Sequence, residues 1–305
     1  APATANVCAK LAHGLADDML TTTVLACRCP KLIAPAMNTN MYENPVTQDN
    51  LALLEKYGWE VISPASGRLA CGAVGPGKLP EPVDLLQHIL RHLALPHDLS
   101  GKRVLVSAGP TQEAIDPVRY LTNHSTGKMG YALARMAMLR GADVTLVSGP
   151  TAIEPPPFLR TIPVVSAQDM YDAISENAPQ ADFIFMAAAV ADYTPTECAD
   201  NKIKKKDGDM AIPLKRTRDI LGFLGEHRAP GQILCGFSME TQNMLENSRA
   251  KLSKKHVDMI CANNLKVPGA GFGVDTNILT LITRDAITEL PKMSKEEAAN
   301  AILDQ

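Results

Sequence analysis

The stretch Arg103-Val-Leu-Val-Ser-Ala-Gly-Pro110 is a nearly unbroken apolar run that ends in glycine and proline. An apolar run without alternation is typical of a strand that is buried on both faces of a sheet. A helical pattern follows at residues 128–140, and the same succession of apolar run and helical pattern repeats towards the C-terminus. Helices between buried strands imply right-handed parallel crossovers. The stretch therefore predicts a doubly wound α/β sheet.

Further apolar runs extend this prediction in both directions along the chain. Strands are expected at residues 143–148, 182–190, 232–237, 259–262 and 278–282, with helices at residues 167–177 and 240–256. The segment Lys202–Pro213 departs from the alternation, because Asp207-Gly208 stands between alternating residues. Asp-Gly in that setting is typical of a tight β-hairpin. We expect a basic arm that projects from the sheet.

The first hundred residues carry a weaker pattern of the same kind. Apolar runs at residues 31–35 and 59–63 predict short strands, and helical periodicity covers residues 46–57 and 83–93. Proline and glycine mark residues 94–101 as a linker, so we expect domains at residues 1–97 and 98–305. Ala1-Pro-Ala-Thr-Ala-Asn6 has neither an initiator methionine nor a signal sequence, so the chain is expected to begin inside a domain.

The composition predicts a soluble globular protein. The 305 residues are 46% hydrophobic and 21% charged, with a formal net charge of −3. No apolar run approaches the ~20 residues that a membrane span needs. The balanced charge argues against nonspecific electrostatic binding of nucleic acid. Seven scattered cysteines, an odd number, favour a reduced cytoplasmic protein over a disulfide framework.

The strongest signal for a ligand site follows the first strand of the second domain. Ser107-Ala-Gly-Pro-Thr111 ends that strand, and Asn123-His-Ser-Thr-Gly-Lys-Met-Gly130 opens the next helix. Small residues let backbone amides approach an anion, and a helix N-terminus adds positive potential. Ser125 and Thr126 would either cap the helix or bind phosphate oxygens. The glycine spacing matches neither the dinucleotide-binding fingerprint nor a Walker A loop, so a capping loop without a ligand is an equal alternative.

A second signal is Met186-Ala-Ala-Ala-Val-Ala-Asp-Tyr193, at the carboxyl end of a predicted central strand. Ligands of open α/β sheets bind at that edge. The alanines leave room for a flat ring to approach the backbone, and Asp192 is suited to hold a cation or a ribose hydroxyl. A solvated aspartate at a strand end explains the same residues equally well.

Lysines provide the third signal. The predicted arm carries Lys202, Lys204, Lys205 and Lys206, and Lys251 and Lys255 share one face of a predicted helix. Lysines on an edge hairpin usually discourage aggregation, and lysines on a helix usually face solvent. The sharper alternative is a cationic flap that covers a triphosphate.

The first domain offers two polar groups. Asn38 lies in Pro35-Ala-Met-Asn-Thr-Asn-Met41 and is suited to bind a carboxylate or a carbonyl group. Cys71 lies in the glycine-rich stretch Gly67–Gly77, where a thiol on a flexible loop can act as an acid. The alternative for Cys71 is a small buried residue without a role.

Taken together, these motifs resemble one family over almost the whole chain: the bifunctional coenzyme A biosynthesis protein, in which phosphopantothenoylcysteine decarboxylase is fused to phosphopantothenate–cysteine ligase. Residues 35–41, residues 70–77 and the first six residues resemble the decarboxylase motifs. Residues 123–130, residues 187–193 and Lys202-Ile-Lys-Lys205 resemble the ligase motifs. The resemblance implies the C-terminal half of a flavodoxin-like decarboxylase domain, followed by a Rossmann-like doubly wound ligase domain with a basic β-hairpin flap.

For the ligase half, the resemblance implies a reaction in two steps with CTP, Mg²⁺, 4′-phosphopantothenate and cysteine. The substrate carboxylate attacks the α-phosphate of CTP to form an acyl-cytidylate, and the cysteine amine then displaces CMP. By position, Asn123 would hold the acyl-cytidylate, Lys202 would neutralise phosphate charge, Ser125 and Gly127 would bind phosphate, and Asp192 would hold Mg²⁺. The implied CTP contacts are Ala189, Asp192, Thr217, Arg218, Asp219, Ile220, Phe237, Lys251 and Lys255.

For the decarboxylase half, the resemblance implies a flavin enzyme that uses FMN. Cys71 would be the proton donor, Asn38 would bind the substrate, and Thr4 and Asn6 would lie on the flavin and substrate side. The family's decarboxylase begins upstream of residue 1 with a flavin-binding loop and a catalytic histidine, so decarboxylation is not expected from this chain alone. The family's ligase pairs as dimers and its decarboxylase as trimers, so we expect a homo-oligomer, with a dimer formed through the ligase half.

Two other functions fit the α/β alternation. A nicotinamide-dependent oxidoreductase would share the fold, but its glycine fingerprint and its acidic residue are absent from the expected places. A non-catalytic regulatory subunit would explain an incomplete first domain. Binding of NADH would indicate the first alternative, and CTP-dependent turnover would exclude the second.

Overall fold

The computed structural model describes residues 1–70, 72–205, 209–240, 243–264 and 273–305. The chain divides into two compact units, Ala1–Leu95 and Pro96–Gln305, and each is described by itself.

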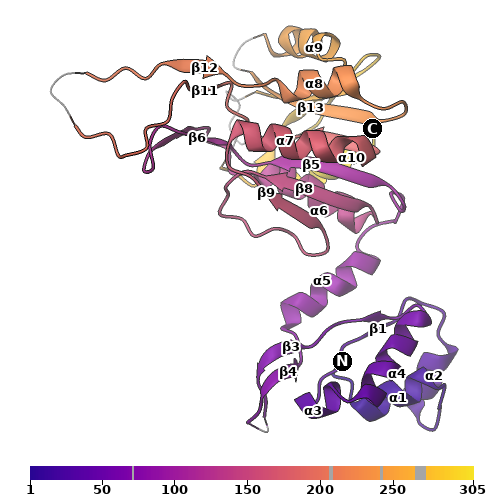
Figure 1. The fold of residues 1–305 in the computed structure, drawn as a ribbon. Coiled ribbons are helices and arrows are strands. Elements are labelled where there is room, and N and C mark those ends of the chain that lie inside the picture. The colour runs from indigo at the N-terminus through magenta and orange to yellow at the C-terminus, as the bar shows by residue number, and fades with distance from the viewer. Residues whose placement is uncertain (71, 206–208, 241–242, 265–272) are drawn as a thin grey trace. The chain divides into compact units, whose positions relative to one another are not determined.

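The described residues of the C-terminal unit form an eight-stranded sheet at its centre (Figure 1). From one edge to the other, the strands are β9 (Arg160–Pro163), β8 (Asp143–Ser148), β5 (Arg103–Ala108), β10 (Phe183–Met186), β13 (Ile233–Glu240), β14 (Met259–Asn264), β16 (Leu279–Thr283) and β17 (Ile287–Glu289). The first six are parallel and follow the 3-2-1-4-5-6 order of the Rossmann fold. The predicted doubly wound sheet is therefore confirmed.

Helices cover both faces of this sheet. On one face, α7 (Ala167–Asn177), α8 (Ile220–His227) and α9 (Met244–Lys254) share a core with alternate residues of the strands, among them Leu105, Ile184 and Leu234. The 3₁₀ turn Ala178–Gln180 follows α7. On the other face, α6 (Lys128–Leu139) packs between the sheet and α10 (Lys295–Leu303), which is why most of its residues are buried.

Three predictions, two of strands and one of a helix, need correction. The run 182–190 forms a strand only to Met186, because the next residues leave the sheet and Ala189 bridges to Pro110 instead. The predicted helix 240–256 begins only at Met244, because β13 continues to pair with β14 as far as Glu240. The run 278–282 was expected to be parallel to the other strands, but it lies antiparallel to β14. An apolar run indicates that a strand is buried, but it does not indicate the direction of the strand.

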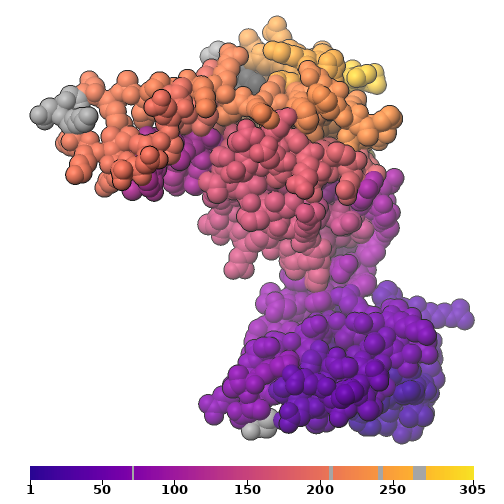
Figure 2. Space-filling model, in the orientation of Figure 1, coloured from indigo at the N-terminus to yellow at the C-terminus, as the bar shows by residue number. Residues whose placement is uncertain are grey.

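Among the described residues of this unit, three two-stranded ribbons lie beside the main sheet. They pair β6 (Gln112–Ala114) with β7 (Tyr120–Thr122), β11 (Tyr193–Pro195) with β12 (Leu214–Arg216), and β15 (Thr276–Asn277) with β18 (Met293–Ser294). The described residues between β11 and β12 (196–205 and 209–213), which we call the arm, project from this unit (Figure 1 and Figure 2). The pairing lies at the base of the arm, and the predicted turn at Asp207-Gly208 falls outside the described residues.

The N-terminal unit is smaller. Its elements are α1 (Ala5–Ala12), α2 (Met19–Ala26), β1 (Leu32–Ile33), α3 (Thr39–Tyr42), α4 (Pro45–Lys56), β2 (Glu60–Val61), β3 (Ala65–Arg68), β4 (Val74–Lys78) and α5 (Pro82–Leu93). The parallel pair β1–β2 is shorter than the two predicted strands. The core is formed by Ala3, Cys8, Ala12, Ile33, Leu51 and Leu54.

Candidate functional site

Two adjoining cavities open at the switch point of the sheet, between β5 and β10, where the order of successive strands reverses. The chain proceeds from β5 outward to β8 and β9, and from β10 outward to β13 and β14, so the loops after β5 and β10 diverge. The larger cavity has a volume of about 490 Å³ and the smaller one about 410 Å³. Both are lined by Ala188, Val190, Asp192, Phe237 and Lys251. The two cavities therefore share a wall.

The smaller cavity is bounded by the loop that leads into α6. Gly127 adopts a left-handed conformation with φ of 80° and ends the loop without a side-chain cap, while the hydroxyl of Ser125 accepts the Gly127 N–H at 3.3 Å. A Cβ atom on Gly130 would lie 2.6 Å from the Cβ of Ala108, so only glycine lets α6 approach β5 this closely. The uncapped N-terminus of α6 thus faces the cavity that Ser125 and Gly127 line.

A hydrogen-bond network fixes the main chain between the cavities. The Asn123 amide donates to the carbonyl of Ala189 at 2.9 Å, and the N–H of Ala189 donates to the carbonyl of Gly109. The buried hydroxyl of Thr111 accepts the N–H of Ala191 at 3.0 Å, and the hydroxyl of Thr217 donates to the Ala191 carbonyl at 2.6 Å. Asn123 and Thr217, about ninety residues apart in the chain, therefore hold the same segment.

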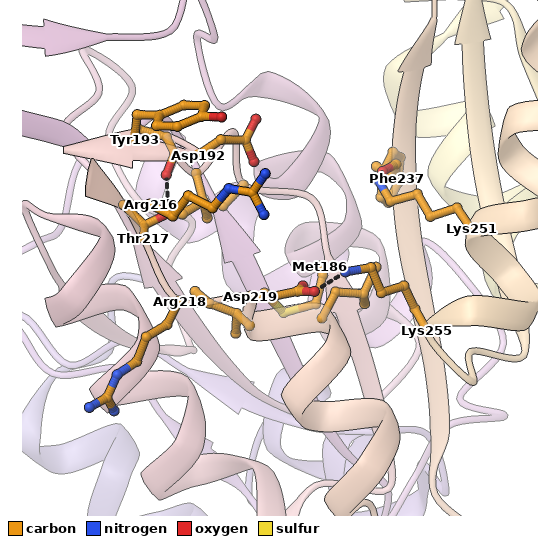
Figure 3. Close-up of a pocket in the computed structure, with 15 residues that line it drawn as sticks. Met186, Asp192, Tyr193, Arg216, Thr217, Arg218, Asp219, Phe237, Lys251 and Lys255 are labelled. Carbon is orange, nitrogen blue, oxygen red and sulfur yellow. Dashed lines mark hydrogen bonds and ion pairs between the residues drawn. The ribbon is translucent and has the colours of Figure 1, made fainter. Parts of the chain in front are cut away.

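The larger cavity brings together most of the predicted nucleotide contacts (Figure 3). Thr217, Arg218, Asp219, Ile220, Phe237, Lys251 and Lys255 all line it. Asp219 caps α8 through the N–H of Gly222 and forms an ion pair with Lys255. The Lys251 ammonium donates to the carbonyl of Phe237 at 2.8 Å.

The side chains of this cavity do not all point inward. Figure 3 shows Arg218 pointing away from Asp219, and its guanidinium lies 4.6 Å from the centre of the Tyr171 ring. Arg216, which the sequence analysis missed, points towards Asp192 instead. Arg216 is the last residue of β12 and pairs with Tyr193, whereas Thr217 and Arg218 lie beyond the strand, so the local sequence does not indicate which arginine faces the cavity.

Lys295 is a second residue that the sequence analysis missed. It lines the smaller cavity, is buried, and donates to the carbonyls of Val274 and, at 3.0 Å, Thr276. Burial, together with the charge of Lys128, lowers the pKa of this ammonium group, although Asp275 acts in the opposite sense. The capping box of Ser294 and Glu297 predicts a helix start here but gives no sign of a cavity.

Lys202 lies on the arm and is exposed. Among the described residues, neither cavity is lined by Lys202, Lys204 or Lys205. Lys206 falls outside the described residues.

The N-terminal unit brings its predicted segments together at one edge. Ala3 forms hydrogen bonds with Ala34 and Ala36, and the N–H of Met37 donates to Gly77 of β4 at 3.0 Å. Thr4 caps α1, the exposed Asn6 lies on α1, and the Asn38 side chain accepts the N–H of Asn40 at 2.9 Å. Cys71, between β3 and β4, lies outside the described residues.

Within the described part of the chain, no group of three or more His, Cys, Asp or Glu residues is arranged to hold a metal ion. No helix formed by the described residues is long and apolar enough to cross a membrane.

The strand order and the crevice at the sheet's switch point define a Rossmann-like ligand-binding domain. Residues 99–305 match the family model of the DNA/pantothenate metabolism flavoprotein C-terminal domain, and residues 1–94 match the flavoprotein family model. Coenzyme A biosynthesis bifunctional protein CoaBC of Bacillus subtilis is 50% identical over 309 residues, which span 100% of this chain and 76% of that protein. The chain belongs to the family of bifunctional CoaBC proteins.

Two solved structures resemble the C-terminal unit. A crystal structure of the C-terminal domain of a CoaBC protein is 44% identical, with a TM-score of 0.58, and the match covers 68% of this chain and 94% of that one. The DNA/pantothenate metabolism flavoprotein from Streptococcus pneumoniae is 26% identical, with a TM-score of 0.59, over 67% of this chain and 97% of that one.

Proposed function

We propose that this chain catalyses the ligase reaction of coenzyme A biosynthesis, the CTP-dependent joining of 4′-phosphopantothenate and cysteine to form 4′-phosphopantothenoylcysteine. The observation that carries the proposal is the pair of cavities with a common wall, in a chain that is 50% identical to a CoaBC protein. A reaction that joins a nucleotide to a carboxylate needs two such adjacent subsites.

The larger cavity would take CTP, and the smaller one would take 4′-phosphopantothenate. Lys251 and Lys255 line this cavity and supply positive charge for the nucleotide phosphates. The N-terminus of α6 favours the anionic groups of the acyl substrate. The backbone near Ala189–Ala191 would read the cytosine edge.

In the first step, a carboxylate oxygen of 4′-phosphopantothenate forms a bond to the α-phosphorus of CTP, and the bond to pyrophosphate breaks. In the second step, the amine of cysteine forms a bond to the acyl carbon, CMP leaves, and the amine loses a proton. Neither step requires a protein nucleophile, so catalysis depends on orientation and on neutralisation of phosphate charge. Asn123 would hold the acyl-cytidylate, and Lys202 would neutralise phosphate charge.

The donor set suits Mg²⁺ bound together with a nucleotide. Asp192 offers one carboxylate on the wall that both cavities share, and Mg²⁺ usually binds through one or two carboxylates plus substrate phosphates. When bound there, the ion would supply further neutralisation of phosphate charge.

The N-terminal unit would contribute to an FMN-dependent decarboxylase in the intact enzyme. This rests on the flavoprotein match over residues 1–94 and on the segments of Thr4, Asn38 and Gly77 lying side by side. Cys71 as the proton donor and Asn6 on the flavin side stay predictions, as do the homo-oligomer and the cytoplasmic location.

The test is pyrophosphate release by the purified chain with 4′-phosphopantothenate, cysteine and Mg²⁺, with CTP or ATP as the nucleotide. Release that requires both CTP and 4′-phosphopantothenate is expected. Lys255→Met should raise the KM for CTP, whereas Lys254→Met, at the exposed last residue of α9, should not. No release with CTP from a folded sample would contradict the proposal.

A further inference from the structure

Asp116 is a buried carboxylate that the reaction described above leaves without a role. It lies in the turn between β6 and β7, and its side chain has no exposed surface. Oδ1 accepts the backbone N–H groups of Val118 and Arg119, at 2.8 and 2.9 Å, and so closes its own turn. The turn therefore uses only Oδ1 of the carboxylate, and its own N–H groups do not bind Oδ2.

The second oxygen is used on the arm. Oδ2 accepts the backbone N–H of Ile203 at 3.1 Å and the Arg119 guanidinium at 3.0 Å. The same guanidinium donates to the Ile203 carbonyl at 2.8 Å, although the two residues are 84 positions apart. Both polar groups of the Ile203 backbone are thus held by the Asp116–Arg119 pair.

A second contact holds the arm four residues earlier. The N–H of Ala199 donates to the carbonyl of Ile115 at 3.0 Å, and Ile115 precedes Asp116 in the same turn. Lys202 lies between these two points of attachment. Its backbone is therefore fixed on both sides, while its side chain remains exposed.

The hydrogen bonds of the Asp116 carboxylate favour its charged form. The Arg119 guanidinium, with the backbone N–H groups of Val118, Ile203 and Arg119, holds the pKa of Asp116 well below its usual range. Hydrogen bonds from a guanidinium to a carboxylate are charge-assisted and stronger than neutral ones.

We propose that Asp116 is a positioning residue for Lys202, acting through the hydrogen bonds that it and Arg119 make with the backbone of Ile203. This inference rests on the proposed ligase function, in which Lys202 neutralises phosphate charge. A lysine on an exposed arm samples many positions, and misplacing a reacting group by 1 Å can reduce a rate by about a hundredfold. Asp116 restricts the arm so that Lys202 is presented in one place.

The test is a double-mutant cycle of Asp116→Asn and Lys202→Gln in the full chain. The asparagine oxygen can still accept the two N–H groups of the turn. The NH₂ group that replaces Oδ2 cannot accept hydrogen bonds from the Ile203 N–H or the Arg119 guanidinium. Asp116→Asn should lower kcat by about tenfold or more and leave the KM for CTP unchanged within about twofold. In the Lys202→Gln background, the same change should alter the remaining rate by less than about twofold, because the two residues act as a unit.

Hydrogen exchange at the Ile203 amide supplies a readout that needs no turnover. The exchange should be slow in the wild type and in Lys202→Gln, and faster in Asp116→Asn. Asp182→Asn is the matched control, because Asp182 also accepts a backbone N–H and a guanidinium, both from Arg103, where β5 begins. It should change neither the kcat nor the exchange at Ile203.

Three results would overturn the inference: full activity in Asp116→Asn, an equal loss in both backgrounds, or unchanged exchange at Ile203. Failure of the proposed function looks different, because the wild-type chain would then release no CTP-dependent pyrophosphate while its Ile203 amide remained protected.

Discussion

Asn123 shows how a single side chain can set the geometry of a site. Its amide donates to the carbonyl of Ala189, and Thr111 and Thr217 hold the next peptide groups. The segment that lies between the two cavities is therefore fixed by side chains from three different parts of the chain. Small residues at positions 187–189 leave the backbone accessible, and the hydrogen bonds keep it in place.

Asn123→Asp should impair turnover more than CTP binding. The substitution removes the donor and sets a carboxylate oxygen against the Ala189 carbonyl oxygen, which repels it. We expect the lost hydrogen bond and this repulsion to lower kcat by about tenfold. The measurement is CTP affinity by calorimetry alongside steady-state kcat. Asn177→Asp is the control, because Asn177 likewise donates to a carbonyl, that of Ala173, away from both cavities. Equal losses of affinity and kcat would contradict the prediction.

Lys295 should give the chain a characteristic pH dependence of stability. Since burial lowers its pKa, the unfolded state binds more protons than the folded state between the folded pKa and the ordinary value of about 10.4. The unfolding free energy of the wild type, relative to Lys295→Met, should therefore rise with pH in that window. Urea unfolding from pH 7 to 10 measures this, and exposed Lys292→Met should show no such trend. A falling difference would contradict the assignment.

At the scale of the element, the contact between α6 and β5 decides where the helix N-terminus lies. Gly130→Ala would put a Cβ atom 2.9 Å from the carbonyl oxygen of Ser107 and 2.6 Å from the Cβ of Ala108. We expect a loss of about 1–3 kcal/mol in the unfolding free energy, as for other overpacked contacts, together with weaker binding in the smaller cavity. Gly273→Ala enters open space and should change stability by less than about 0.5 kcal/mol. Urea unfolding of both variants is the measurement.

Most elements could be predicted because their patterns are local. The helices near residues 45–56, 128–139 and 167–177 agree with their periodicity to within one or two residues. The predicted end of β10 and the predicted start of α9 were wrong, because both positions depend on where strands of the sheet stop pairing. Arg216, Lys295 and Asp116 were missed for a related reason, since each acquires its surroundings from residues distant in the sequence.

At the scale of the whole molecule, the C-terminal unit should function alone. Residues 96–305 contain the complete eight-stranded sheet and both cavities, and a relative's C-terminal domain has been crystallised by itself. This fragment should unfold cooperatively and release pyrophosphate in the presence of CTP as the full chain does. Comparing the two proteins in the same assay tests this prediction, and an inactive but folded fragment would contradict it.

The sequence by itself determined the family, the doubly wound sheet and most of the residues that line the larger cavity. The sheet could be predicted because buried strands and helix periodicity are encoded by neighbouring residues. The family and the cavity residues were predicted from the resemblance of the motifs to those of a known family. Only the tertiary structure decided which arginine faces Asp192, that Lys295 reaches the smaller cavity, and that Asp116 holds the arm beside Lys202. These facts depend on strand order and on contacts between residues up to 87 positions apart, which local patterns do not record.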